Sequence, residues 1–162
     1  MTNHRISLQV NGDDLTIDVE PRTLLVDALR SECRLLGTHV ACEQGACGSC
    51  TVLLDGRSVR SCLLFAIQVE GAAITTIESV GSPDNLHPLQ EALMQNHGLQ
   101  CGFCTAGVVM SALELVNSFE APTRREIEAW LSGNLCRCTG YSGIVDAIEM
   151  CISSRAAMVE KS

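Results

Sequence analysis

The first eighty residues alternate between apolar and polar positions, as short β-strands do. The turn pairs Asn11–Gly12 and Asp55–Gly56 interrupt this alternation at the points where two hairpins would reverse. Between the hairpins, leucines and alanines recur at helical spacing as far as Gly37, which predicts an amphipathic helix with a glycine stop. The predicted elements are a hairpin over 5–10 and 15–19, a helix over 23–36, a second hairpin over 51–62 and a last strand over 74–77.

After residue 80 the pattern becomes helical. Residues 81–88 (GSPDNLHP) are polar, contain two prolines and show no period, so they predict a linker. Thr123 and Glu126 have the spacing of a capping box at the start of the third helix. The predicted helices are 88–97, 104–119, 123–131 and 142 to about 156. The chain is therefore predicted to be α+β, with domains over 1–80 and 89–162 joined by a linker over 81–88.

Composition and charge narrow the class of protein. The 162 residues are 46% hydrophobic but only 3% aromatic, so two small aliphatic cores would benefit from an additional crosslink. The net charge of −8 divides evenly, with 6 basic against 10 acidic residues up to residue 80 and 5 against 9 after it. Neither half is suited to nucleic acid, and the acidity instead suits a protein partner with a complementary surface.

Ten cysteines are the candidates for that crosslink. The first residues show no charged segment followed by an apolar run, and no apolar run approaches the length of a membrane span. These features predict a cytoplasmic protein. In that reducing compartment, clustered cysteines favour metal or redox chemistry over disulfides.

The first cysteine quartet lies mainly in an aperiodic, glycine-rich loop. Its order is C-x4-C-x2-C followed by a distant cysteine, which is the plant-type ferredoxin spacing for a [2Fe–2S] cluster. Gly45 and Gly48 fit this loop, because side chains there would collide with the cluster and backbone N–H groups can point at its sulfurs. A zinc ribbon is the alternative, but it would normally show two C-x2-C pairs. The predicted ligands are Cys42, Cys47, Cys50 and Cys62.

The second quartet lies at two helix junctions. Cys101 and Cys104 form a C-x2-C between the first two helices of the second half, and Cys136 and Cys138 form a C-x-C between the last two. Two such junctions can meet at one end of a helical bundle. The C-x-C pair is tight for a disulfide or a zinc knuckle but can offer two thiolates to one cluster. Spacing alone leaves zinc open as an alternative here.

Four segments resemble the iron–sulfur subunit of molybdenum hydroxylases. HGLQCGFCTAG (97–107) and GNLCRCTGY (133–141) resemble the family's two helical-domain motifs, and GTHVACEQGACGSC (37–50) with RSCLLFA (60–66) resembles its ferredoxin-like motif. The family includes small subunits of quinoline, isoquinoline, nicotinate and aerobic carbon monoxide dehydrogenases, and the N-terminal segment of xanthine dehydrogenases. The resemblance implies an N-terminal β-grasp ferredoxin-like domain followed by a C-terminal four-helix domain, with a second [2Fe–2S] cluster on the second quartet.

The resemblance also implies partners and a direction of electron flow. A large subunit would carry molybdopterin, as the cytosine dinucleotide, and a medium subunit would carry FAD, in a dimer of heterotrimers without nucleic acid or a membrane span. Gln100 and Cys138 would approach the pterin, so the second quartet would receive electrons and the first would pass them to FAD. The chain itself shows no acid–base pair, nucleophile elbow or phosphate loop, so we expect no catalytic centre on it.

The remaining cysteines, histidines and aromatic residues have simpler interpretations. Cys33 and Cys151 are expected to be small core residues, the histidines loop residues, and Trp130 and Tyr141 packing or subunit contacts. A stand-alone redox sensor and a freely diffusing two-cluster ferredoxin are the competing functions. The substrate of the complex stays open among N-heterocycles, aldehydes, purines and carbon monoxide, with a slight preference for the first two.

Overall fold

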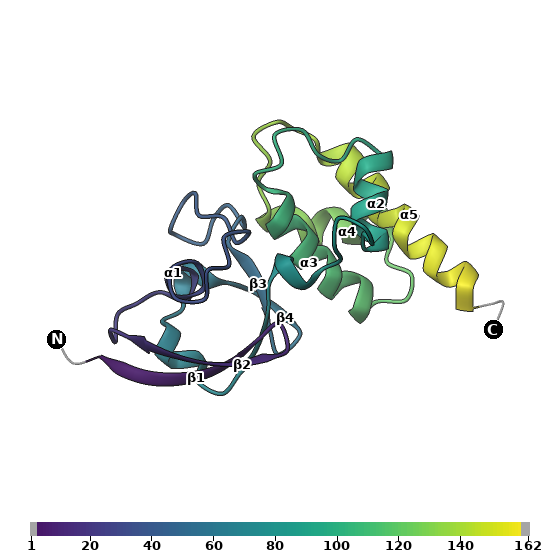
Figure 1. The fold of residues 1–162 in the computed structure, drawn as a ribbon. Helices are drawn as coiled ribbons and strands as arrows, with labels where there is room; N and C mark the ends of the chain where they lie inside the picture. The colour runs from purple at the N-terminus through teal and green to yellow at the C-terminus, as the bar shows by residue number, and fades with distance from the viewer. Residues whose placement is uncertain (1–2, 160–162) are drawn as a thin grey trace.

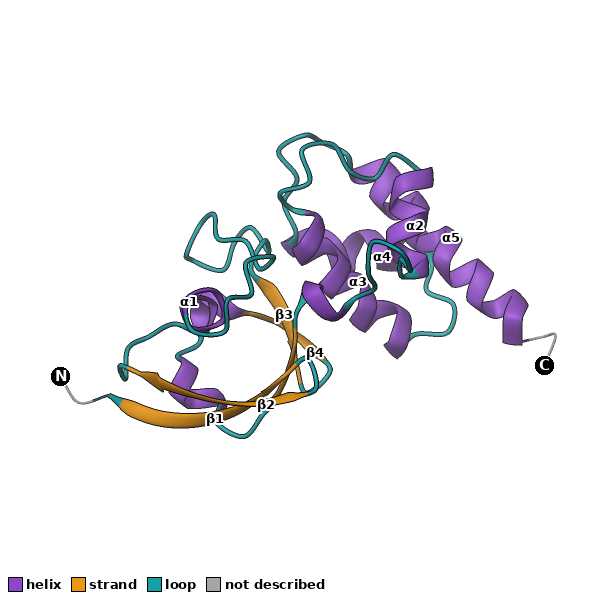
Figure 2. Cartoon of the chain, viewed as in Figure 1, coloured by secondary structure: helices purple, strands orange, loops and turns teal. Residues whose placement is uncertain are grey.

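The computed structural model describes residues 3–159, with side chains as far as Arg155, and confirms the α+β class (Figures 1 and 2). The described residues form a mixed five-stranded sheet in the order β2-β1-β5-β3-β4. Neighbouring strands are antiparallel except β1 and β5, which are parallel. The strands are β1 His4–Val10, β2 Asp13–Val19, β3 Thr51–Leu54, β4 Arg57–Arg60 and β5 Ala73–Thr75.

Both predicted hairpins are confirmed. At each turn the two central residues have positive φ, 55° and 92° for Asn11 and Gly12, and 50° and 81° for Asp55 and Gly56. Such turns match the right-handed twist of the strands that they join. The last strand is displaced from its predicted limits, because Ile77 already begins a short 3-10 helix, η3 Ile77–Ser79.

The first helix is shorter than predicted. α1 spans Leu25–Ser31, so the predicted limits of 23 and 36 are wrong and Gly37 is not its stop. Arg34 has a φ of 60°, a left-handed conformation that the helix cannot continue through. The guanidinium of Arg30 donates to two backbone oxygens of the following turn and holds the chain there. The chain therefore leaves the helix early and enters the cysteine loop.

The second half contains four α-helices as far as residue 159, each within three residues of its predicted limits. The capping box of α4 is confirmed, because the Thr123 hydroxyl accepts the Glu126 N–H at 3.4 Å and the Glu126 carboxylate accepts the Thr123 N–H at 2.7 Å. The helices are α2 Pro88–Gln95, α3 Thr105–Ser118, α4 Arg124–Trp130 and α5 Tyr141–Val159, with 3-10 helices η1 Ser61–Leu63, η2 Ala66–Val69 and η4 Leu131–Gly133. Within the described part of the chain, no helix is long and apolar enough to cross a membrane.

One hydrophobic core lies under the sheet and another lies among the helices. Leu53 of β3 belongs to the helical core, so the sheet packs directly against α3. Cys151 is buried in the helical core and Cys33 is half-buried against the sheet core, as predicted. The domain limits of 1–80, 81–88 and 89–162 stay a prediction, and residues 1 and 162 lie outside the described part.

Three loops gather on the same side of the molecule, at the top of Figures 1 and 2. One joins α1 to β3, another joins α2 to α3, and the third joins η4 to α5. These loops carry seven of the eight cysteines in the two quartets. The fold therefore brings both quartets to one edge of the contact between sheet and helices.

Candidate functional site

The loop after α1 wraps its backbone N–H groups around Cys42. The Cys47 N–H lies 3.4 Å from the Cys42 sulfur. Hydrogen bonds from the backbone of Gln44, then Cys47 and Ala46, lower the pKa of the Cys42 thiol to about 7. Donors aimed at a sulfur stabilise its thiolate form. The thiolate is the form in which cysteine binds iron.

The other half of the first quartet is buried. Cys50 directly precedes β3 and Cys62 lies in η1, and their exposed fractions are 2% and 4%. Burial, followed by contact with the Cys50 thiol, raises the pKa of Cys62 to about 11. The charge of Cys42 also contributes to the raised pKa of Cys62, as the smallest of its causes. These interactions link Cys42 to Cys47 and Cys62, and Cys62 to Cys50, so the four predicted ligands are connected pairwise.

Two glycines shape this loop. Gly45 and Gly48 both have a φ of +75°, where a side chain is strained. A β-carbon at Gly45 would lie 2.5 Å from the Leu63 side chain, and one at Gly48 would lie 2.5 Å from the backbone oxygen of Gly133. The loop is therefore held against η1 on one side and the helical half on the other.

The second quartet forms where two loops meet at the start of α3. The Phe103 N–H, and then the Cys138 thiol, lower the pKa of Cys101. Burial, and then contact with Cys136, raises the pKa of Cys104 to about 12. The contacts therefore pair Cys101 with Cys138 and Cys104 with Cys136, joining the C-x2-C motif to the C-x-C motif.

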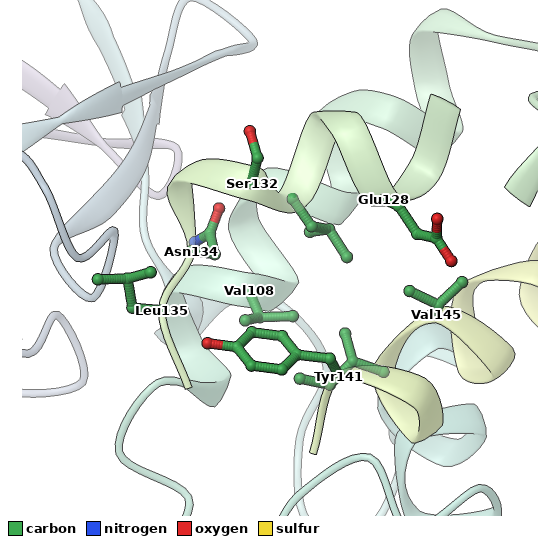
Figure 3. Close-up of a pocket in the computed structure, with 9 residues that line it drawn as sticks. Val108, Glu128, Ser132, Asn134, Leu135, Tyr141 and Val145 are labelled. Atoms are coloured by element: carbon green, nitrogen blue, oxygen red, sulfur yellow. The ribbon is translucent and has the colours of Figure 1, made fainter. Parts of the chain in front are cut away.

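Tyr141 supports the second quartet, a role that the sequence did not predict. Its hydroxyl accepts the Cys136 N–H at 2.9 Å. Its ring lines a pocket of about 290 Å³, in which Figure 3 shows the hydroxyl directed toward the segment that carries Leu135. The one sequence signal for this role is that Tyr141 ends the GNLCRCTGY motif. The side chain of Gln100 also reaches this loop and donates to the Cys138 carbonyl at 3.1 Å.

The cysteine contacts are pairwise rather than tightly convergent. Within residues 3–159, no three Cys, His, Asp or Glu side chains form a group that could hold a metal ion. A cleft of about 410 Å³ lies beside the second quartet and is lined by Cys101, Cys104 and Cys136, together with Cys47 of the first quartet. Thiols with backbone N–H groups at their sulfurs and adjoining space are a suitable environment for an iron–sulfur cluster.

The two quartets are joined by contacts between their loops. The Leu135 N–H donates to the Cys47 carbonyl at 2.8 Å. His39 Nδ1 lies 2.7 Å from the Phe103 carbonyl, and the two rings stack with centroids 4.7 Å apart. The prediction that His39 is a loop residue is confirmed, and its added role is to link one cysteine loop to the other.

Comparison with known proteins identifies both halves. Residues 8–74 match a family described as a 2Fe-2S iron-sulfur cluster binding domain, and residues 76–149 match a [2Fe-2S] binding domain family. The chain is 49% identical to caffeine dehydrogenase subunit gamma of Pseudomonas sp. (strain CBB1), over 92% of this chain and 91% of that protein. It is 51% identical to the nicotine 6-hydroxylase small subunit of Paenarthrobacter nicotinovorans, over 88% and 86% of the two chains.

A solved structure shows the same fold. A chain of quinoline 2-oxidoreductase from Pseudomonas putida 86 superposes with a TM-score of 0.92 at 46% identity, covering 98% of each chain. The similarity therefore extends over the sheet, the helices and the loops between them.

Proposed function

The chain belongs to the iron–sulfur subunits of molybdenum hydroxylases, and on this premise we propose that its two cysteine quartets bind one [2Fe–2S] cluster each. It is the electron-transfer subunit of a molybdenum-dependent oxidoreductase and has two [2Fe–2S]-binding domains. The proposed ligands are Cys42, Cys47, Cys50 and Cys62 in the first quartet, and Cys101, Cys104, Cys136 and Cys138 in the second.

The contacts between the loops and the sulfurs carry the ligand assignment. Backbone donors favour the thiolate at Cys42 and Cys101, while burial and paired thiols surround Cys62 and Cys104. When bound, such a cluster takes up and releases single electrons at a potential set by hydrogen bonds to sulfur and by solvent exposure. This chain's own residues supply both features: backbone N–H groups at the Cys42 and Cys101 sulfurs, and different degrees of burial at the other cysteines.

We assign the finer architecture by analogy with the family. The sheet with α1 would be a β-grasp ferredoxin-like domain, and α2 to α5 a four-helix domain. Gln100 and Cys138 would face the pterin of a molybdopterin-binding large subunit. The Gln100 side chain supports this assignment, because it is exposed and its amide holds the Cys138 backbone in place. Electrons would leave from the first quartet toward FAD on a medium subunit.

The same reasoning extends to the assembly and its location. Relatives named as subunits or small subunits imply large and medium partners, for which we propose a dimer of heterotrimers. All ten cysteines are free in the structure, which suits the reducing cytoplasm.

For the substrate of the complex, we propose an N-heterocycle. The reason is that the compared relatives are named for caffeine, nicotine and quinoline, which all contain nitrogen heterocycles. Because caffeine is a purine, the proposed class includes purines. Dye-linked oxidation by the purified complex, assayed with N-heterocycles, aldehydes, purines and carbon monoxide, tests this choice. Turnover of an aldehyde alone would contradict it.

Metal analysis and electron paramagnetic resonance (EPR) of the purified complex test the ligand assignment. We expect about four irons per copy of this chain and two distinct signals from reduced [2Fe–2S] clusters. Cys62→Ala should abolish one signal and Cys136→Ala the other, each with loss of about two irons. Cys151→Ala serves as the matched control and should keep both signals. Zinc in either quartet, or both signals surviving a ligand substitution, would contradict the assignment.

A further inference from the structure

The segment directly before Cys136 is hydrogen-bonded to the loop of the first quartet. The Leu135 N–H donates to the Cys47 carbonyl at 2.8 Å, although the two residues are far apart in sequence. Cys47 and Cys136 are proposed ligands of different quartets. One connection between the quartets thus runs from the Cys47 sulfur through its own backbone, across this one hydrogen bond, and along two residues to the Cys136 sulfur.

Asn134 holds this connection in place. The residue is 4% exposed, and its side-chain amide donates to the Gly48 carbonyl at 3.3 Å. Its amide oxygen accepts the hydroxyl of Ser111 on α3 at 2.9 Å. The amide therefore joins three elements: the first cysteine loop, α3 and the segment that leads into the second quartet. A buried amide whose partners are fixed permits one register and penalises others, because a shifted segment would leave polar groups unpaired.

The remaining contacts of this segment agree with that role. Arg60 of β4 donates to the Gly133 carbonyl at 2.8 Å and to the Thr51 hydroxyl at 2.6 Å. A β-carbon on Gly107 of α3 would lie 2.1 Å from the Gly48 oxygen, so α3 leaves that carbonyl little freedom. Residues 133–135 are thus held on both sides, with the Asn134 amide at the centre.

We propose that Asn134 is a positioning residue for electron transfer between the two quartets. Asn134 would favour this transfer by keeping the Leu135 N–H hydrogen-bonded to the Cys47 carbonyl. This inference rests on the proposed function, since it needs a cluster in each quartet. The step is a one-electron exchange, in which one cluster is oxidised by one electron as the other is reduced by one, and no bond to the protein changes.

The experiment compares the purified complex with its Asn134→Leu variant. Leucine has a similar size but cannot hydrogen-bond to Ser111 or Gly48. Glu114→Ala is the matched control, because the Glu114 carboxylate accepts the Ser58 N–H at 2.7 Å across the same contact between sheet and helices but away from both quartets. Two quantities are measured at equal iron content. One is the magnetic splitting between the two reduced clusters in EPR, and the other is the rate of electron exchange between them after pulse reduction.

We expect Asn134→Leu to change the splitting and slow the exchange severalfold, and Glu114→Ala to change neither. Equal changes in both variants would overturn the proposal, since any loosening of the contact between sheet and helices would then suffice. Unchanged splitting and rate in Asn134→Leu would overturn it as well, and would leave the proposed function intact. Failure of the proposed function is recognised separately, by the absence of two [2Fe–2S] signals in the unaltered complex.

Ser111→Ala is a milder variant that still tests the proposal if Asn134→Leu loses iron. Ser111→Ala leaves Asn134 in place but removes the hydroxyl that orients its amide. The proposal expects a smaller change of the same kind in this variant. Full iron with unaltered splitting and rate in Ser111→Ala, together with iron loss in Asn134→Leu, would show a purely structural role and overturn the proposal.

Discussion

Replacing Gly107 by alanine tests how closely α3 packs against the first cysteine loop. Gly107 lies in the first turn of α3, and a β-carbon there would be 2.1 Å from the Gly48 carbonyl oxygen and 3.0 Å from the Ser49 Cα. Ordinary contact begins at 3.4 Å, so the new methyl group is 1.3 Å too close to the oxygen. The obstructing atoms belong to the backbone and cannot rotate away as a side chain could.

The expected cost is the difference between two opposing effects. Overpacking of this kind typically costs about 1–3 kcal/mol. Alanine stabilises a helix by about 1 kcal/mol relative to glycine, which offsets part of this cost. Because the obstruction is rigid, we place the net destabilisation at about 1–2 kcal/mol, which corresponds to a fall in Tm of about 2–8 °C for a chain of this length. The Gly48 carbonyl should also move relative to Asn134, so the first quartet should lose iron more readily.

Thermal denaturation followed by circular dichroism, together with the rate of iron loss to a chelator, measures both effects. Asn117→Ala is the matched control, because it places alanine at an exposed position near the other end of the same helix, away from the cysteine loops. It should leave Tm and iron retention nearly unchanged. If Gly107→Ala were as stable as the unaltered chain and kept its iron as well, the close approach of α3 to Gly48 would not be a constraint of the fold.

Three further predictions concern other parts of the chain. Burial lowers the pKa of His87, whose Nδ1 accepts the Leu89 N–H at 3.2 Å, so the folded state favours the neutral ring. This stabilisation is complete above the unfolded pKa of about 6.5 and is lost as pH falls through the lower folded value. Melts from pH 8 to 5 should therefore show a steeper decline in Tm for the unaltered chain than for His87→Asn, and equal slopes would refute this. Arg60→Met should lower the free energy of unfolding in urea by about 1.5–3 kcal/mol, because its charged hydrogen bonds are lost. Arg57→Met is the control and should lower it by almost nothing, since the Arg57 side chain is 86% exposed. Similar losses in both variants would argue against the Arg60 contacts. Cys151→Ser should lower Tm by placing a hydroxyl in the helical core while the iron content stays constant, and iron loss would make Cys151 a ligand.

The sequence determined the features that depend on near neighbours. Turn pairs such as Asn11–Gly12 need positive φ at adjacent positions, so the hairpins could be predicted from composition and spacing. The capping box at Thr123 and Glu126 likewise closes within three residues. Cysteine spacing predicted the first quartet, since three of its members lie in one loop, while the second quartet needed resemblance to a family to favour iron over zinc.

The end of α1 shows where local reasoning failed. Leu35 and Leu36 continue a helical pattern, yet the chain turns at Arg34 because the Arg30 guanidinium binds the backbone beyond it. Helical spacing records which side chains are apolar but not which backbone oxygens the Arg30 guanidinium will bind. The predicted helix therefore ran five residues too far.

Only the tertiary structure decided how the two quartets are connected. The Asn134 amide and the Gly48 carbonyl are 86 residues apart in sequence, and Arg60 and Gly133 are 73 apart. No periodicity or spacing links such positions, because their contact depends on the docking of the sheet against α3. Cysteine spacing thus predicted the first cluster site and resemblance to a family predicted the second. Packing between the two halves sets the register of one buried asparagine, which we propose determines how the two sites are joined.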